Sequence, residues 1–201
     1  MLDEFLKRLA PESAEYKLVQ DAFGLSANLK IKLDAIRLDA DLSAEGRAKK
    51  AKQEALGHPL GHLKQLHSRV TAMQADTANL RKSLAPPPPD RADTYGELER
   101  RELRDFVRSL PPAERLRVVM GDPVITEAVL LGHAQLSGLS PEQLSTVKDS
   151  YVQRVHGERL AGIERREATV AVVKDALATA TGEFRREAGL TEAEIEKALA
   201  A

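Results

Sequence analysis

The segment Leu56–Leu84, LGHPLGHLKQLHSRVTAMQADTANLRKSL, carries the clearest structural pattern in this chain. Apolar residues recur in it at alternating spacings of three and four residues. This heptad pattern keeps one stripe of a helix turned toward another helix. We therefore predict that the segment packs against a second helix, supplied by the same chain or by a second copy. Its predicted partner-binding residues are Leu56, Leu63, Leu66, Val70, Met73, Leu80 and Leu84, with Thr77 as the polar member of the row.

The composition favours helices throughout. The chain has 201 residues, of which 42% are hydrophobic and only 3% aromatic, with no Trp. Ala, Leu, Glu, Arg and Lys, which dominate, are typical of long helices rather than of sheets. We therefore predict an all-α fold. The absence of Cys excludes disulfides, thiolate nucleophiles and cysteine-ligated metal sites.

The segment before the seam is predicted to pair with it. Two short helices are expected over residues 2–10 and 12–23, the second ended by Gly24, and a long helix over 26–56. Gly57–Gly61 contains two glycines and Pro59, which predicts a chain reversal and hence a long, coiled-coil-like helical hairpin. The alternative is one helix bent at Pro59 that pairs with a second chain. The long helix carries a second apolar face, formed by Leu25, Ile31, Leu38 and Leu42.

The run Pro86–Pro89 ends the seam, because consecutive prolines cannot continue a helix. It also marks the best domain boundary. We predict N-terminal helices and hairpin over residues 1–85, a proline linker over 86–91, and a helical region over 92–201. A short proline run can also bind aromatic grooves of partner domains, but the flanking residues do not indicate that role.

The C-terminal region is predicted to form a helical bundle with one very long helix. Shorter helices are expected over 92–110, 113–120 and 123–131; in the first, Leu98, Leu103, Phe106, Val107 and Leu110 would pack inward. Ser140, Pro141 and Gln143 form a helix-starting capping box. The helix that follows is expected to run over about 141–188, with a last short helix starting at Thr191. It carries a second seam whose predicted partner-binding residues are Ile163, Val170, Val173, Leu177 and Phe184.

The charge distribution is uneven although the net charge is only −1. Lys and Arg number six, eight and sixteen in residues 1–46, 47–85 and 86–201, against nine, two and twenty Asp and Glu. The basic middle block either pairs with the acidic flanks or binds an anion such as nucleic acid. We favour pairing, because the block has no aromatic residue on which bases could stack. Its candidate anion-binding residues are Arg47, Lys49, Lys50, Lys52, Lys64, Arg69, Arg81 and Lys82.

No pattern identifies a reaction. His58, His62 and His67 are the best metal candidates, but Pro59 and two glycines share their turn and no acidic residue lies within it. His133 and His156 have no recognisable catalytic partner. The glycines do not form a phosphate-binding loop, and no Glu-x-x-His motif is present. We therefore predict no catalytic residue, metal, cofactor or small-molecule substrate.

These patterns together predict a non-catalytic helical protein that self-associates or binds a helical partner, as a scaffold, adaptor or assembly chaperone. The analogy is with assembly proteins of bacteria and their viruses, and it is architectural only. A nucleic-acid-associated coiled coil is the alternative, and an enzyme with a site after Pro89 is a weaker one. The acidic N-terminal residues and the absence of a long uncharged run predict a cytoplasmic location with no membrane span.

Overall fold

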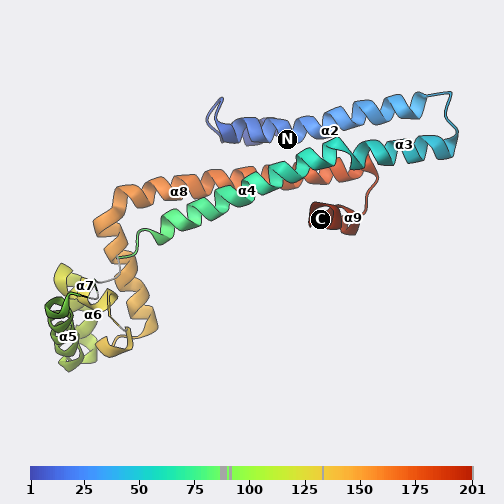
Figure 1. The fold of residues 1–201 in the computed structure, drawn as a ribbon. Coiled ribbons are helices and arrows are strands. Elements are labelled where there is room, and N and C mark those ends of the chain that lie inside the picture. Colours follow the sequence, from blue (N-terminus) through green and yellow to red (C-terminus); the bar gives the residue numbers. More distant parts are fainter. Residues whose placement is uncertain (87–89, 91, 133, 201) are drawn as a thin grey trace. The chain divides into compact units, whose positions relative to one another are not determined.

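The computed structural model describes residues 1–86, 90, 92–132 and 134–200, and its regular elements are helices (Figure 1). Across these residues no strand forms, which confirms the predicted all-α class. The contacts divide the chain into unit 1, Met1–Thr77 with Arg165–Ala201, and unit 2, Ala78–Glu164. This grouping differs from the predicted division at the prolines, because residues 165–201 join the N-terminal helices. Much of the predicted linker, residues 87–89 and 91, lies outside the described residues.

Unit 1 is built from long helices around one hydrophobic core. Leu29, Leu63 and Leu177, from three different helices, all lie in that core. A hydrogen bond joins two of these helices, because the Ser26 hydroxyl donates to the Ala180 carbonyl at 3.1 Å. The elements are α1 (Leu2–Leu6), α2 (Ala14–Leu38), α3 (Ala44–Leu56), α4 (His58–Lys82) as far as Thr77, α8 (Pro141–Ala188) from Arg165, and α9 (Glu192–Ala200).

Helix α2 differs from the sequence prediction at both ends. It begins after Ser13, whose hydroxyl accepts the Tyr16 N–H at 3.1 Å, and it runs through Gly24 without a break. The predicted helix end at Gly24 is therefore wrong, as is the single helix over 26–56. Because apolar residues on both sides of Gly24 bury the same face of α2, packing outweighs the weak helix propensity of one glycine.

The chain reverses between α2 and α3, earlier than predicted. Asp39 Oδ1 accepts the Asp41 N–H at 3.1 Å, and Ser43 caps α3 by accepting the Gly46 N–H at 3.1 Å. Such local side-chain bonds compete with a continuous helix. Figure 1 shows the turn, with α3 returning beside α2. The hairpin turn predicted at Gly57–Gly61 is wrong, because α4 begins directly after Gly57 and continues in the direction of α3.

Unit 2 is a group of shorter helices around a second core. This core contains Val107, Val119, Val129 and Val147, each almost fully buried. Leu98 and Phe106 were predicted to pack inward, and this is wrong because both side chains are exposed. The elements are α5 (Thr94–Ser109), α6 (Pro112–Gly121), α7 (Pro123–Leu130), the 3-10 helix η1 (Ala134–Ser137) and α8 as far as Glu164.

The long helix α8 confirms the prediction over 141–188. Its capping box forms as expected, because the Gln143 N–H donates to Ser140 Oγ at 3.2 Å and the Ser140 N–H donates to Gln143 Oε1 at 2.9 Å. His156, next to Gly157, departs from helical geometry with φ −128° and ψ 22°. This break divides α8 into two helical segments. Gly189 then ends α8 with a positive φ of 65°, a conformation that favours glycine.

Candidate functional site

The two predicted seams lie mainly in the interior of the chain. Leu56 and Leu80 are partly exposed, at 39% and 38%, and Met73 is half-buried. A partner could reach the buried members only if the helices around them separated, so their role in partner binding stays a prediction. The buried members are Leu63, Leu66, Val70, Leu84, Ile163, Val170, Val173, Leu177 and Phe184, together with Thr77.

Several residues of the basic block contact acidic or carbonyl groups within unit 1. Arg47 donates to the Asp39 carbonyl at 3.0 Å, Lys50 lies 3.4 Å from the Asp39 carboxylate, and Lys52 lies 3.5 Å from Glu194. The two lysine ion pairs are exposed and individually weak, but they offset part of the positive charge that the block offers to an external anion; the Arg47 contact, with a neutral carbonyl, uses a donor without offsetting its charge. Among the remaining candidates, Lys64 is half-buried, and Lys49, Arg69, Arg81 and Lys82 are exposed.

The histidines do not converge on a metal. The rings of His58 and His62 lie 6.3 Å apart, whereas His67 contacts Thr181 Oγ1 at 2.9 Å, and its pKa is lowered by burial. No group of three or more potential ligands occurs among residues 1–86, 90, 92–132 and 134–200. His156 lies at the break in α8 with its ring 6.2 Å from Tyr151, and His133 lies outside the described residues.

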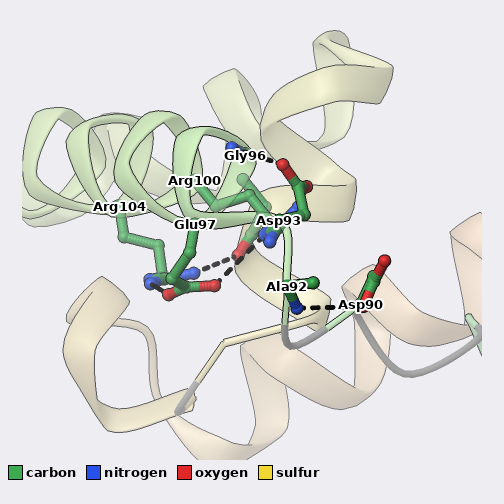
Figure 2. A network of polar contacts seen from close by, with 8 residues as sticks. Asp90, Ala92, Asp93, Gly96, Glu97, Arg100 and Arg104 are labelled. Atoms are coloured by element: carbon green, nitrogen blue, oxygen red, sulfur yellow. Dashed lines mark hydrogen bonds and ion pairs between the residues drawn. The ribbon is translucent and has the colours of Figure 1, made fainter.

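An arginine–carboxylate network at the start of α5 was not predicted from the sequence (Figure 2). Asp93 caps α5 by accepting the Gly96 N–H at 2.9 Å, and its carboxylate also lies 3.3 Å from Arg100. Glu97 accepts from Arg104 at 2.7 Å and from Arg100 at 3.2 Å, so both of its oxygens have donors. The network thus joins two carboxylates to two guanidinium groups over the first three turns of the helix.

The network lowers the pKa of both carboxyl groups. For Glu97 the main cause is the hydrogen bond from Arg104, followed by that from Arg100. For Asp93 the main cause is the hydrogen bond from the Gly96 backbone, and Arg100 adds to it. Both groups are therefore held ionised at neutral pH. Both carboxylates are hydrogen-bonded to arginine side chains. With their lowered pKa values, neither is suited to accept or donate a proton near pH 7.

Arg104 is the central residue of this site. It is only 4% exposed, and its guanidinium donates to the Ala128 carbonyl of α7 at 3.1 Å as well as to Glu97. Gly132 makes room for it, because a Cβ at Gly132 would lie 2.5 Å from Arg104 Nη1. Arg104 Nε is buried and has no hydrogen-bond partner among the described residues. A buried donor of this kind is costly unless some acceptor reaches it.

A cavity of about 620 Å³ lies beside the network, within unit 2. Residues Glu97, Arg101, Arg104 and Arg108 lie on one side of α5, since a helix turns about 100° per residue. Leu131, Gly132 and Leu136 form the rest of the wall, together with Asp105 of α5. Charged and apolar side chains therefore surround the same space.

Helix α2 presents a second, mainly apolar face on the side away from the core. Ile31 and Leu38 are 68% and 84% exposed, and Asn28 and Ala35 in the same row are exposed as well. These four residues follow the three-four spacing of a coiled-coil seam, with Asn28 as its polar member. We call them the outer face of α2. The sequence pattern had already identified Ile31 and Leu38 as part of a second apolar face.

Comparison with protein-family models, curated proteins and solved structures finds no match to this chain. Within the part of the chain that the structure describes, none of the helices has the length and apolar content needed to cross a bilayer.

Proposed function

We propose that this chain is a non-catalytic assembly protein that self-associates through the outer face of α2, with a second copy of the chain as its partner. The observation that carries the proposal is the exposure of Ile31 and Leu38 on a helix whose opposite face is already buried. A surface helix normally shows one apolar stripe. Helix α2 has two apolar faces, which favours contact with two neighbours. The first face packs within unit 1, and the outer face is left for a partner.

The residue types of the outer face suit a parallel pair of α2 helices. If Asn28 occupies heptad position a, Ala35 also falls at a, and Ile31 and Leu38 fall at d. In a parallel pair each of these residues meets its own copy. A single Asn at position a specifies the register and the number of helices in such a pair, at a cost in stability. Asn28 therefore favours a second copy of this chain over an unrelated helix.

The small side chain of Ala35 lies between the two large ones and helps the helices to approach each other. Ile31 and Leu38 can then pack against their copies at the usual interaxial distance of about 8–10 Å. The outer face is short, with only two large apolar residues in each chain. Its contribution to binding is correspondingly limited.

The expected affinity is moderate. Burying an Ile or Leu side chain contributes about 1.5–3 kcal/mol, so four such side chains in a dimer contribute about 6–12 kcal/mol in total. Association costs an estimated 4–15 kcal/mol in lost freedom of motion. A single helix face therefore supports association in the micromolar range or weaker, as expected of a component whose assembly depends on its local concentration.

Sedimentation equilibrium of the full chain tests the proposal, over roughly 1 µM to 1 mM so that micromolar affinity is visible. We expect the wild-type chain to associate, and the double variant Ile31→Glu/Leu38→Glu to stay monomeric with unchanged helix content. The matched control is Val124→Glu, because Val124 is also an exposed apolar residue but lies on α7 of unit 2. A monomeric wild-type chain, or equal association of the double variant, would contradict the proposal.

Nucleic-acid binding through the basic block is the second candidate and has less support. The ion pairs of Lys50 and Lys52 within unit 1 offset part of the charge available to a phosphate backbone, and Arg47 already donates to the Asp39 carbonyl. Such binding would weaken steeply between low and moderate salt. An electrophoretic mobility assay at low salt distinguishes the candidates, because self-association through the outer face of α2 predicts no shift of DNA or RNA.

A further inference from the structure

We propose that the cavity beside α5 binds the phosphate group of a small molecule, held by Arg101, Arg104 and Arg108. These arginines follow one another at spacings of three and four residues, so they lie along one side of α5. All three line the same cavity of about 620 Å³. The site lies within unit 2 and does not depend on self-association through α2.

The available donors exceed the available acceptors in this cavity. Both oxygens of Glu97 accept from Arg100 and Arg104, and Asp105 accepts from Arg108 at 2.5 Å. Arg101 has no hydrogen bond or ion pair with any described residue. Three guanidinium groups therefore face two carboxylates that already have donors, and the lining carries a net positive charge.

Arg104 and Arg101 differ in how their donors are used. Arg104 Nε has no acceptor among the described residues but is shielded from solvent, so the donors that Arg104 offers to the cavity are those of its other guanidinium nitrogens. Arg115 provides the contrast within the same unit. Its guanidinium donates to the carbonyls of Leu110, Gly138 and Arg108 at 2.9, 2.9 and 2.8 Å, as expected of a purely structural arginine. Exposed Arg101 retains unused donors at the cavity, which an oxyanion would satisfy.

The chemistry of the lining favours phosphate over a carboxylate. Guanidinium groups bind phosphate oxygens in pairs, and a phosphate offers more acceptor oxygens than a carboxylate. Gly132 brings its backbone close to Arg104 without a side chain in between. Leu131 and Leu136 add apolar surface, and the cavity is much larger than a phosphate ion. We therefore expect a phosphorylated small molecule with an apolar portion to bind more tightly than phosphate alone.

Titration of the full-length protein with inorganic phosphate and then phenyl phosphate tests this inference, at constant ionic strength with chloride as the competing ion. The readout is the shift of backbone amide NMR signals in α5 and at Gly132. Acetate and benzoate are titrated in the same way, to compare the binding of carboxylates with that of the matching phosphates. We expect saturable shifts with phosphate, tighter binding of phenyl phosphate, and weaker binding of both carboxylates.

Arg101→Gln is the decisive variant, because Arg101 has no structural contact with a described residue whose loss would disturb the fold. Loss of its charge-assisted bonds should weaken phenyl phosphate binding about tenfold or more. Arg117→Gln, at an exposed arginine on α6 that does not line the cavity, should leave the affinity unchanged. Equal affinity of Arg101→Gln and wild type, equal binding of benzoate and phenyl phosphate, or no saturable shift with either phosphate would overturn the inference.

Discussion

Replacing Gly132 with Ala should destabilise unit 2, because Gly132 makes room for the buried Arg104 side chain. A Cβ at this position would lie 2.5 Å from Arg104 Nη1 and 2.7 Å from its Cδ and Cζ. The tip of an arginine is usually free to move aside, but this one is 4% exposed and donates to the Ala128 carbonyl and to Glu97. Displacing the guanidinium therefore breaks two hydrogen bonds in a confined space.

The expected cost follows from these two bonds. A hydrogen bond from a charged donor contributes about 1.5–3 kcal/mol, and the bond to the buried Ala128 carbonyl falls in that range. The bond to Glu97 adds little more, because the Glu97 side chain is 53% exposed and solvent screens the pair. We expect Gly132→Ala to lower the free energy of unfolding of unit 2 by about 2 kcal/mol.

Urea denaturation followed by far-ultraviolet circular dichroism measures this change, and amide hydrogen exchange along α5 assigns it to unit 2. Gly121→Ala is the matched control. Gly121 ends α6 in the same unit, and a Cβ there would meet nothing within 4 Å. This control should be neutral or stabilising by up to about 1 kcal/mol. Equal stability of the two alanine variants, or unchanged exchange along α5 in Gly132→Ala, would show that Gly132 does not hold the space that Arg104 needs.

Three further outcomes are expected. Ser43→Ala should lower the free energy of unfolding by about 1 kcal/mol in urea denaturation, because it removes the cap of α3; no loss relative to Ser68→Ala would contradict this. Because hydrogen bonding lowers the pKa values of Glu97 and Asp93 from 4.5 and 3.8, their stabilising contribution is complete above those values and is lost as the pH falls through the folded-state pKa. The melting temperature should therefore fall between neutral and acid pH, and this fall should be smaller in Glu97→Gln than in the wild-type chain. Burial lowers the pKa of His67 from 6.5, so stability is lost as the pH falls below that value; an NMR titration of the His67 ring that gives a pKa of 6.5 or higher would disprove this.

The sequence predicts helix type and several helix ends well, because those signals are local. The Ser140–Gln143 capping box forms as expected. The last helix also starts where predicted, at Thr191, whose hydroxyl accepts the Glu194 N–H at 3.3 Å. The heptad seams correctly identify buried rows such as Leu63, Leu66 and Val70. The heptad period and the helix caps both depend on residues within one or two turns. They can therefore be recognised in a single sequence.

The sequence predicts the hairpin turn poorly, because competing local signals have similar strength. Gly57 and Pro59 look like a stronger break than Asp39 and Ser43, yet Pro59 is accommodated in the first turn of α4, where its missing N–H costs nothing. The side-chain bonds of Asp39 and Ser43 instead stop α2 and start α3. Packing of α2 against α3 and α4 decides between these positions, and that packing is not visible in a local pattern.

The arginine site is also invisible in the sequence. Arg104 lies in a run of charged residues that reads as a solvated helix face, whereas the structure buries it and exposes Leu98 and Phe106. The signal that distinguishes it is spatial: Gly132, far along the chain, leaves the space that Arg104 fills. A single arginine does not form a periodic pattern. To predict this site, one would need to know which residues that are distant in the sequence lie close together in the fold.

A single spin label tests most directly whether the outer faces of two α2 helices meet. The chain has no cysteine, so Ala27→Cys provides one labelling site at the exposed edge of that face, where the label leaves the contact itself unchanged, and Ala48→Cys on exposed α3 provides a control. Helices in contact lie about 8–10 Å apart, so contact between the outer faces predicts a short intermolecular distance at position 27, about 25 Å or less between labels, by double electron–electron resonance. A well-populated dimer in which the position 27 labels are farther apart than the position 48 labels, or a labelled chain with no intermolecular signal at high concentration, would show that the outer faces do not meet.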